Sequence, residues 1–132
     1  MVSVIVPVYN GERTIRDCIE SLLHLNYPSD RYEIIIVDND STDATATLVQ
    51  KYPVKYVLEN SCRARATARN AGARIATGDL LAFIDADCVA DPLWLKESVS
   101  FLVSHKEIGS VGGRILSFQD NHAETLVERF QH

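Results

Sequence analysis

Short runs of apolar residues recur along the chain at intervals that predict strands. Each run contains β-branched side chains and is bounded by polar or turn-forming residues, a pattern typical of strands buried on both faces. Four such runs cover residues 2–8, 32–37, 54–58 and 80–84. A fifth strand is predicted at residues 108–111, and residues 114–118 either continue it or form another.

Apolar positions at helical spacing fill the gaps between the predicted strands. In residues 15–23 they fall at i, i+3, i+4, i+7 and i+8, which places them on one helix face. The Ala- and Arg-rich stretch at residues 63–75 has high helix propensity. Further helices are predicted near residues 44–52, after Asp91-Pro92, and at residues 123–130.

This alternation of strand and helix predicts the fold class. Short connections between alternating elements favour an α/β fold, a three-layer, doubly wound, mostly parallel sheet with helices on both faces. In the strand order 3-2-1-4, residues 2–8 form the central strand, flanked by residues 32–37 and 80–84. No internal repeat, low-complexity tract or linker interrupts the pattern, so we expect a single domain over residues 1–132.

Composition and charge narrow the possible functions. The 132 residues include 13 Lys and Arg against 18 Asp and Glu, and the net charge of −5 argues against a protein that wraps nucleic acid. No apolar run approaches the roughly 20 residues of a membrane span, and residues 1–3 lack the basic start of a signal peptide. The three cysteines form no CxxC pair, which argues against structural zinc and favours a reducing compartment.

Polar residues follow the predicted strands at the edge where ligands bind in doubly wound sheets. Ligands occupy the crevice outside the carboxyl ends of the strands, near the point where the strand order reverses. Tyr9, Asp38, Asp85 and Asp87 lie at the ends of the first, second and fourth strands. The topology therefore predicts that these four residues line one crevice.

The two aspartates at i and i+2 suit a metal–diphosphate site. Mg²⁺ commonly uses one or two carboxylates together with substrate phosphates. The alternative is that Asp87 caps the following helix, although Asp91, directly before Pro92, is better placed to do so.

The other crevice residues also have structural alternatives. Asp38 could accept hydrogen bonds from a ribose or a base, or it could be a turn residue that starts the next helix. The Tyr9 ring could stack on a base or pack on the rim. Four arginines could clamp phosphate or lie on a solvated helix face, and they are Arg63, Arg65, Arg69 and Arg74. Cys18 is expected in the core, and packing is the expected role of Cys62 and Cys88.

Four blocks of the sequence stand out, and they are VSVIVPVYNG at residues 2–11, VDNDSTD at 37–43, ARNAGARIATGD at 68–79 and FIDADC at 83–88. Blocks similar to these occur in the same order in the family 2 glycosyltransferases, which have the GT-A fold. The chain therefore resembles the N-terminal, nucleotide-binding half of such an enzyme. The resemblance implies transfer of a sugar from a nucleoside-diphosphate donor to an acceptor, with inversion at the anomeric carbon.

The resemblance also implies roles for individual residues. Tyr9 matches the aromatic residue that lies against the nucleotide base, and Asp38 opens the acidic turn that contacts the base and the ribose. Arg69 and Asn70 match an Arg-Asn pair that helps to form the donor pocket. The implied donor site comprises Pro7, Tyr9, Asn10, Asp38, Asn39, Arg69, Asn70 and Asp85.

The metal site is implied by the same resemblance. Asp85 and Asp87 match the family's DxD motif, with Asp85 toward the ribose and Asp87 on the metal. The implied cofactor is Mn²⁺ or Mg²⁺, which neutralises the diphosphate as the glycosidic bond breaks.

Some features depart from the family pattern. Asn39 stands where a second aspartate is common, and Cys88 stands where a third acid often follows the DxD motif. The family's catalytic base lies well downstream, and no block after the motif matches it. Glu124 and Glu128 lie in the right direction but within a predicted plain helix. We therefore expect the base and the acceptor-binding half beyond His132, so that this chain binds donor and transfers no sugar.

Partners and setting are expectations from the resemblance. The default donor is a UDP-sugar, the acceptor is a sugar or a lipid-linked molecule, and the setting is polysaccharide biosynthesis. No nucleic-acid partner and no membrane span in this chain are expected. We expect a cytoplasmic location, with segments outside this chain placing the protein at the inner face of a membrane.

Other functions fit parts of the same pattern. Residues 81–89 (LAFIDADCV) also fit the signature of haloacid-dehalogenase-type phosphatases, with Asp85 as nucleophile and Asp87 as acid/base, but that motif belongs on a first strand. A nicotinamide-binding domain is disfavoured because the first turn lacks GxGxxG. A nucleotide-sugar-binding module without transferase activity is the non-enzymatic alternative.

Overall fold

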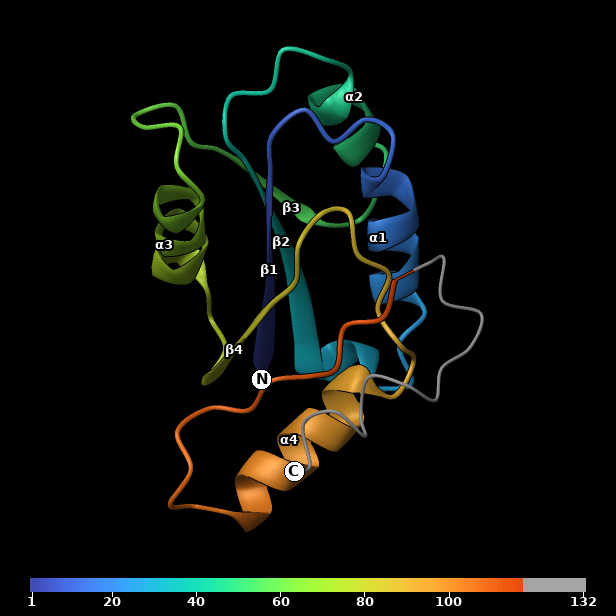
Figure 1. Ribbon diagram of the computed structural model, residues 1–132, viewed down its shortest axis with the longest axis vertical. Coiled ribbons are helices and arrows are strands. Elements are labelled where there is room, and N and C mark those ends of the chain that lie inside the picture. Colours follow the sequence, from blue (N-terminus) through green and yellow to red (C-terminus); the bar gives the residue numbers. More distant parts are fainter. Residues whose placement is uncertain (118–132) are drawn as a thin grey trace. The chain divides into compact units, whose positions relative to one another are not determined.

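The computed structural model describes residues 1–117 (Figure 1). The chain falls into two compact units. The first unit is Met1–Glu97 and holds the sheet and the loops around it. The second unit begins at Ser98 and is described as far as Ser117. The prediction of one domain over residues 1–132 stays a prediction.

Four parallel strands form the sheet of the first unit. They are β1 (Val2–Val8), β2 (Tyr32–Asp38), β3 (Lys55–Leu58) and β4 (Leu80–Phe83). Their order is β3-β2-β1-β4, as predicted, so β1 is central. Val8 pairs in register with Asp38, and Asp38 pairs with Leu58, which brings the carboxyl ends of three strands to one edge.

Helices cover both faces of this sheet. Figure 1 shows α3 (Arg65–Ile75) on one side, and α1 (Ile15–Leu23) and α2 (Thr45–Val49) on the other. A short 3₁₀ turn, Ser29–Arg31, leads into β2, and α4 (Trp94–Ser104) follows the β4 loop. The three-layer, doubly wound parallel prediction is therefore confirmed for the first unit.

The core has two halves, one on each face of the sheet. Ile5, Ile35 and Val37 pack against Ala68 and Ala71 of α3. Small residues on α3 allow the helix to lie close to the sheet. A Cβ added to Gly72 would stand 2.6 Å from Ile5 Cγ2 and 3.1 Å from Val37 Cγ2. The alternating strand positions face the other layer, where α1 buries Ile15, Cys18, Ile19 and Leu22.

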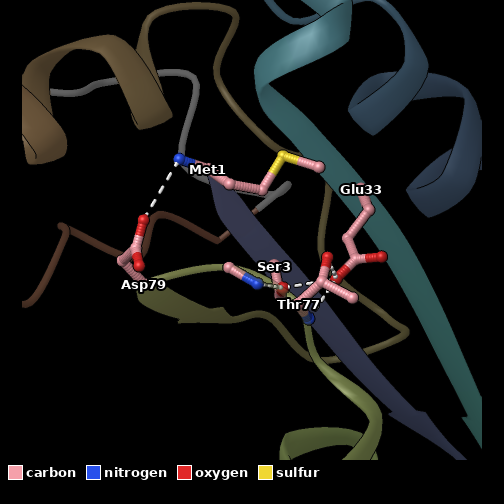
Figure 2. A network of polar contacts seen from close by, with 6 residues as sticks. Met1, Ser3, Glu33, Thr77 and Asp79 are labelled. Carbon is pink, nitrogen blue, oxygen red and sulfur yellow. Dashed lines mark hydrogen bonds and ion pairs between the residues drawn. The ribbon is translucent and has the colours of Figure 1, made fainter.

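At the amino ends of the strands, one carboxylate joins three strands and the end of α3. Glu33 Oε1 accepts hydrogen bonds from Ser3 Oγ at 2.6 Å and from the Thr77 backbone N–H at 2.8 Å (Figure 2). Its Oε2 lies 2.5 Å from Lys55 Nζ, and the Glu33 side chain is 10% exposed. Burial acts to raise the pKa of Glu33, but the hydrogen bonds from Lys55, Ser3 and Thr77 outweigh it and lower the pKa to about 2.

Several predicted elements differ from the structure. Helix α2 is shorter than the predicted stretch near residues 44–52. The strands predicted at residues 108–111 and 114–117 are wrong, because these residues pair with no strand among those described. An apolar run forms a strand only where a neighbour accepts its backbone hydrogen bonds. Residue 118 and the helix predicted at 123–130 lie outside the described residues. Over residues 1–117 no helix is long and apolar enough to cross a membrane.

Candidate functional site

A cleft of about 420 Å³ opens at the carboxyl edge of the sheet. Six of the nine predicted site residues line it, and they are Pro7, Tyr9, Asn10, Asn39, Asp85 and Asp87. Arg63 and Arg65 line it as well. Of the four residues that the topology predicts in one crevice, Tyr9, Asp85 and Asp87 line this cleft and Asp38 does not.

The loops after β1 and β2 are joined by reciprocal hydrogen bonds. Asn10 adopts a left-handed backbone with φ of 50°, which asparagine tolerates better than most residues. Its backbone N–H donates to Ser41 Oγ at 2.8 Å, and its Oδ1 accepts from the Thr42 N–H at 2.8 Å. The next residue, Gly11, donates to the buried Thr45 Oγ1 at 2.9 Å. These bonds fix the β1 side of the cleft.

Asp38 lies behind the cleft lining and is 1% exposed. Its Oδ1 accepts from the Ser41 N–H at 2.9 Å, and its Oδ2 accepts from the Tyr56 hydroxyl at 2.7 Å. Burial, with the hydrogen bond to Asp38 as the second cause, raises the pKa of Tyr56 to about 12. Of the two roles considered for Asp38, binding a ribose or a base and forming a turn, the structure shows the turn. A base or ribose would reach its oxygens only after one of these partners moves.

Asn39 holds the loop that leads from β3 into α3. Its side chain is almost fully buried, at 5% residue exposure. With the amide in the orientation that pairs both of its ends, Nδ2 donates to the carbonyls of Glu59 and Cys62 at 3.0 and 2.9 Å. In the same orientation Oδ1 accepts from the Ala64 N–H at 3.1 Å. An aspartate could not donate these two bonds, so the departure from the family's second acid has a structural reason here.

The turn after β4 carries Asp85 and Asp87. It is closed by a hydrogen bond from the Cys88 N–H to the Asp85 carbonyl at 3.0 Å, and the Cys18 thiol lies 3.7 Å from the same oxygen. Cys18 is fully buried, and burial, followed by the charges of Cys88 and the two aspartates, raises its pKa to about 12. The expected core role of Cys18 is confirmed. Asp87 is exposed toward the cleft.

Asp91, and not Asp87, caps the region before α4. Asp91 Oδ1 accepts from the Leu93 N–H at 2.8 Å, and its carbonyl accepts from the Trp94 N–H. Within residues 1–117, Asp87 forms no ion pair, and its carboxylate has only the weak donor of the Cys88 thiol at 3.7 Å. The capping alternative for Asp87 therefore has no support.

Arg69 reaches from α3 to the turn after β4. Its Nη2 lies 3.2 Å from Asp85 Oδ1, and both side chains are 41% exposed. Its Nε is buried and has no hydrogen-bond partner among the described residues. The adjacent Asn70 is exposed on α3 and is not among the residues that line the cleft. Of the predicted Arg-Asn pair, the structure thus brings only the arginine to the motif.

Arg63 and Tyr9 face each other at the cleft. The guanidinium carbon of Arg63 lies 4.4 Å from the centroid of the Tyr9 ring, a cation–π contact. Tyr9 is 42% exposed, so its ring is accessible from solvent at the rim. Arg74 does not line the cleft, which separates it from Arg63 and Arg65.

Sequence reasoning missed the part that Tyr56 and Thr45 play. Tyr56 pairs in register with Ile36, two residues before Asp38, and a tyrosine on the strand next to a buried aspartate is the signal that could have found it. Thr45 is fully buried and its hydroxyl donates to Asp43 Oδ1 at 2.5 Å. Both residues shape the crevice from behind its lining.

The sheet order and the polar cleft at its carboxyl edge define a class of protein. The parallel sheet has the fold of its structural neighbours, which are GT-A glycosyltransferases, and its cleft is lined by an aromatic residue, two arginines and two aspartates. The chain belongs to glycosyl transferase family 2, whose family model matches residues 3–132. The phosphatase and nicotinamide alternatives are thereby left without support.

Relatives and solved structures agree with this assignment. Glycosyltransferase AglE of Haloferax volcanii is 34% identical over 134 residues, covering 98% of this chain and 43% of that protein. The crystal structure of Staphylococcus aureus TarS 1–349 in complex with UDP is similar with a TM-score of 0.74 and 29% identity, over 88% of this chain and 38% of that one. The mannosyltransferase PcManGT of Pyrobaculum calidifontis, in complex with GDP-Man and Mn²⁺, is similar with a TM-score of 0.72 and 33% identity, over 76% and 32%.

These relatives are much longer than this chain. The chain spans less than half the length of the relatives and structures compared above. The match shows the family and the fold of the part that is present.

Proposed function

We propose that this chain binds the nucleoside-diphosphate part of a sugar donor in the cleft at the carboxyl edge of the sheet. One observation carries the proposal. Asp87 presents an exposed carboxylate in the cleft without an ion pair among the described residues, while Asp85 beside it is held by Arg69. A carboxylate that no protein cation neutralises suits a bound divalent cation, and the diphosphate is then the natural second partner.

The residues present fit a metal that is shared with its substrate. No group of three His, Cys, Asp or Glu side chains within residues 1–117 could hold an ion by itself. Two aspartates that supply hard oxygen ligands are the set that Mg²⁺ or Mn²⁺ uses when phosphates complete its coordination. Asp87 would hold the metal, and Asp85 would lie beside it. When bound, the ion neutralises charge on the leaving diphosphate.

The donor proposal draws on the relatives. TarS has been solved with UDP and with UDP-GlcNAc, and PcManGT with GDP-Man and Mn²⁺. We take a UDP-sugar as the default donor. Tyr9 offers a ring face at the rim on which a base can stack, and Arg65 adds positive charge to the cleft lining.

For the whole protein we propose inverting transfer of the sugar to a sugar or lipid-linked acceptor in polysaccharide biosynthesis. Inverting transfer needs a base that takes the proton of the acceptor hydroxyl within hydrogen-bond reach. Among the described residues, Asp85 and Asp87 are the carboxylates that line the cleft, and both are assigned to the donor side. We therefore propose that these 132 residues alone bind donor and transfer no sugar.

Calorimetric titration tests the donor site directly. UDP, GDP and dTDP are titrated into the chain with and without Mn²⁺, and into the Asp87→Asn variant. Asp79→Asn is the matched control, because Asp79 is an exposed aspartate at the opposite edge of the sheet. We expect Mn²⁺ to strengthen binding of at least one nucleotide, and Asp87→Asn alone to remove that gain. Equal losses in both variants would show that the aspartates act through general charge, and no binding by any nucleotide would overturn the proposal.

A further inference from the structure

We infer that Arg63 is a gate on the nucleotide site: its guanidinium covers the Tyr9 ring in the free protein and moves to the diphosphate when the base takes that ring. The inference rests on the proposed function and names a residue for it. Sequence motifs do not assign this role, because Arg63 lies in the loop before the ARN block, outside the matched blocks. It would make Arg63 a residue that binds the donor directly.

The first argument is where the two side chains lie. Arg63 and Tyr9 line the same cleft, and the guanidinium carbon is 4.4 Å from the ring centroid. A base stacked on an aromatic ring needs the ring face for itself. The ring face that Arg63 occupies therefore cannot receive a base in direct contact until the guanidinium leaves.

The second argument is that Arg63 has little to hold it where it is. It forms no ion pair and donates no hydrogen bond to any residue in the described part of the chain, and its side chain is exposed. An exposed cation–π contact is weak. Arg63 therefore contacts the Tyr9 ring only weakly, and the N–H donors of its guanidinium remain free for a ligand.

The third argument is that the backbone under Arg63 is fixed. Asn39 is hydrogen-bonded to the residues on both sides of it, to the Cys62 carbonyl at 2.9 Å and to the Ala64 N–H at 3.1 Å. The Ala64 N–H also lies 3.0 Å from the Cys62 carbonyl, which tightens the turn. Opening the gate therefore requires only rotation of the Arg63 side chain, with the loop in place.

Charge gives the movement its direction. The ligand brings a diphosphate into a cleft whose lining residue Asp85 is already paired with Arg69, which does not itself line the cleft. Arg63 and Arg65 are then the cations of the lining that have no carboxylate partner among the described residues. A charge-assisted bond from guanidinium to phosphate is stronger than an exposed cation–π contact. Donor binding would thus replace the weak contact between Arg63 and Tyr9 by two others. The base would stack on Tyr9, and Arg63 would donate a hydrogen bond to the phosphate.

Two ligands that differ only in their phosphates distinguish the gate from other roles that Arg63 could have. Binding of UDP and of uridine is measured by NMR titration for the wild-type chain and for Arg63→Gln. For Arg63→Gln we expect the UDP dissociation constant to rise about tenfold, as for the loss of one charge-assisted bond. We expect uridine to bind about two- to fivefold more tightly, because the ring is no longer covered. Arg74→Gln, an exposed arginine of α3 outside the cleft lining, should change neither.

Other outcomes overturn the inference. Equal weakening of UDP and uridine would mean that Arg63 sandwiches the base or supports the loop, and tighter binding of both would mean that it only blocks the ring. No change would leave Arg63 without a role. A readout independent of affinity is the upfield ring-current shift of the Arg63 side-chain protons, which UDP should abolish in the wild-type chain. If wild-type protein binds UDP and these outcomes fail, only the gate is wrong. If it binds no nucleotide at all, the proposed function falls and the gate falls with it.

Discussion

The two edges of the sheet carry similar polar side chains, but these side chains are paired to different degrees with other protein groups. At the amino edge Glu33 accepts hydrogen bonds from Ser3 and Thr77 (Figure 2). It also forms an ion pair with Lys55, and its side chain is 10% exposed. At the carboxyl edge Asp87 is exposed without an ion pair among the described residues, and Arg69 Nε is buried without a partner there.

This difference separates structural polar groups from those available to a ligand. A buried carboxylate with every oxygen paired stabilises the fold and leaves nothing for a substrate to bind. An exposed carboxylate that pairs with no cation of the described residues, such as Asp87, remains available to a ligand. The amino edge should therefore respond to mutation in stability, and the carboxyl edge should respond mainly in binding.

The largest effect is expected from Glu33→Ala. Removing the carboxylate leaves the donors of Ser3 and Thr77 and the charge of Lys55 without their acceptor. We expect a loss of about 3 kcal/mol in the free energy of unfolding, measured by urea denaturation. Nucleotide affinity of the folded protein should not change, since the cleft lies at the other edge. Asp79→Asn, at the same edge but exposed, should leave the urea midpoint where it is. A similar loss in both variants would contradict the comparison.

The free energy of unfolding should also depend on pH through the carboxylate of Glu33. The pKa of Glu33 is about 2 in the folded protein and 4.5 in its ordinary state. Because the folded value is the lower one, its contribution is complete above about pH 4.5 and is lost as the pH falls toward 2. We expect about 3 kcal/mol to disappear over this range in acid-titrated denaturation curves. Glu33→Gln should flatten that slope, and an unchanged slope would assign the acid sensitivity to other groups.

An intermediate effect is expected from Asn39→Asp, because Asn39 both lines the cleft and stabilises the fold. Asn39 lines the cleft, yet its amide holds the loop before α3. A carboxylate there would face the carbonyls of Glu59 and Cys62, so we expect a loss of about 2 kcal/mol at pH 7. The loss should shrink as the pH falls, because a protonated aspartate can donate one bond. Asn60→Asp, exposed in the same loop, is the control and should show neither effect.

The smallest effect on the molecule as a whole is expected from Tyr9→Leu. Tyr9 lies at the rim and is 42% exposed, so thermal unfolding should hardly shift. Loss of the stacking surface should weaken UDP binding about tenfold, within the range measured for single base–aromatic contacts. Calorimetry of UDP binding checks this. A clear fall in the unfolding midpoint with intact UDP binding would place Tyr9 with the structural residues.

The fold was predictable because its signals are local and repeated. The run at residues 2–8 is buried along its whole length in the structure, and α1 buries four of the five apolar positions that helical spacing selected, from Ile15 to Leu22. The topological rule then brought Tyr9, Asp85 and Asp87 to one cleft. Residues 108–111 misled the prediction because an apolar run shows no pairing partner by itself.

The state of individual side chains could not be predicted in the same way. Asp38 and Asp87 both follow strands, yet Asp38 is sealed by Ser41 and Tyr56 while Asp87 is exposed. The difference depends on Tyr56, eighteen residues away on β3, and on the register that brings β3 beside β2. The contact between Arg63 and Tyr9 likewise joins distant loops. Partners of this kind become visible only once the strands are paired.

The central position of β1 has a consequence for how the protein is made. Every residue of β1 is buried, and its two sheet neighbours are β2, which follows next among the strands, and β4, which comes last of the four. During synthesis, this fully buried strand therefore leaves the ribosome before the other three strands and must keep one edge unpaired until β4 has been translated. An open apolar edge pairs readily with other chains. We expect nascent chains that stop before Leu80 to engage chaperones, and to lose that engagement once β4 is added.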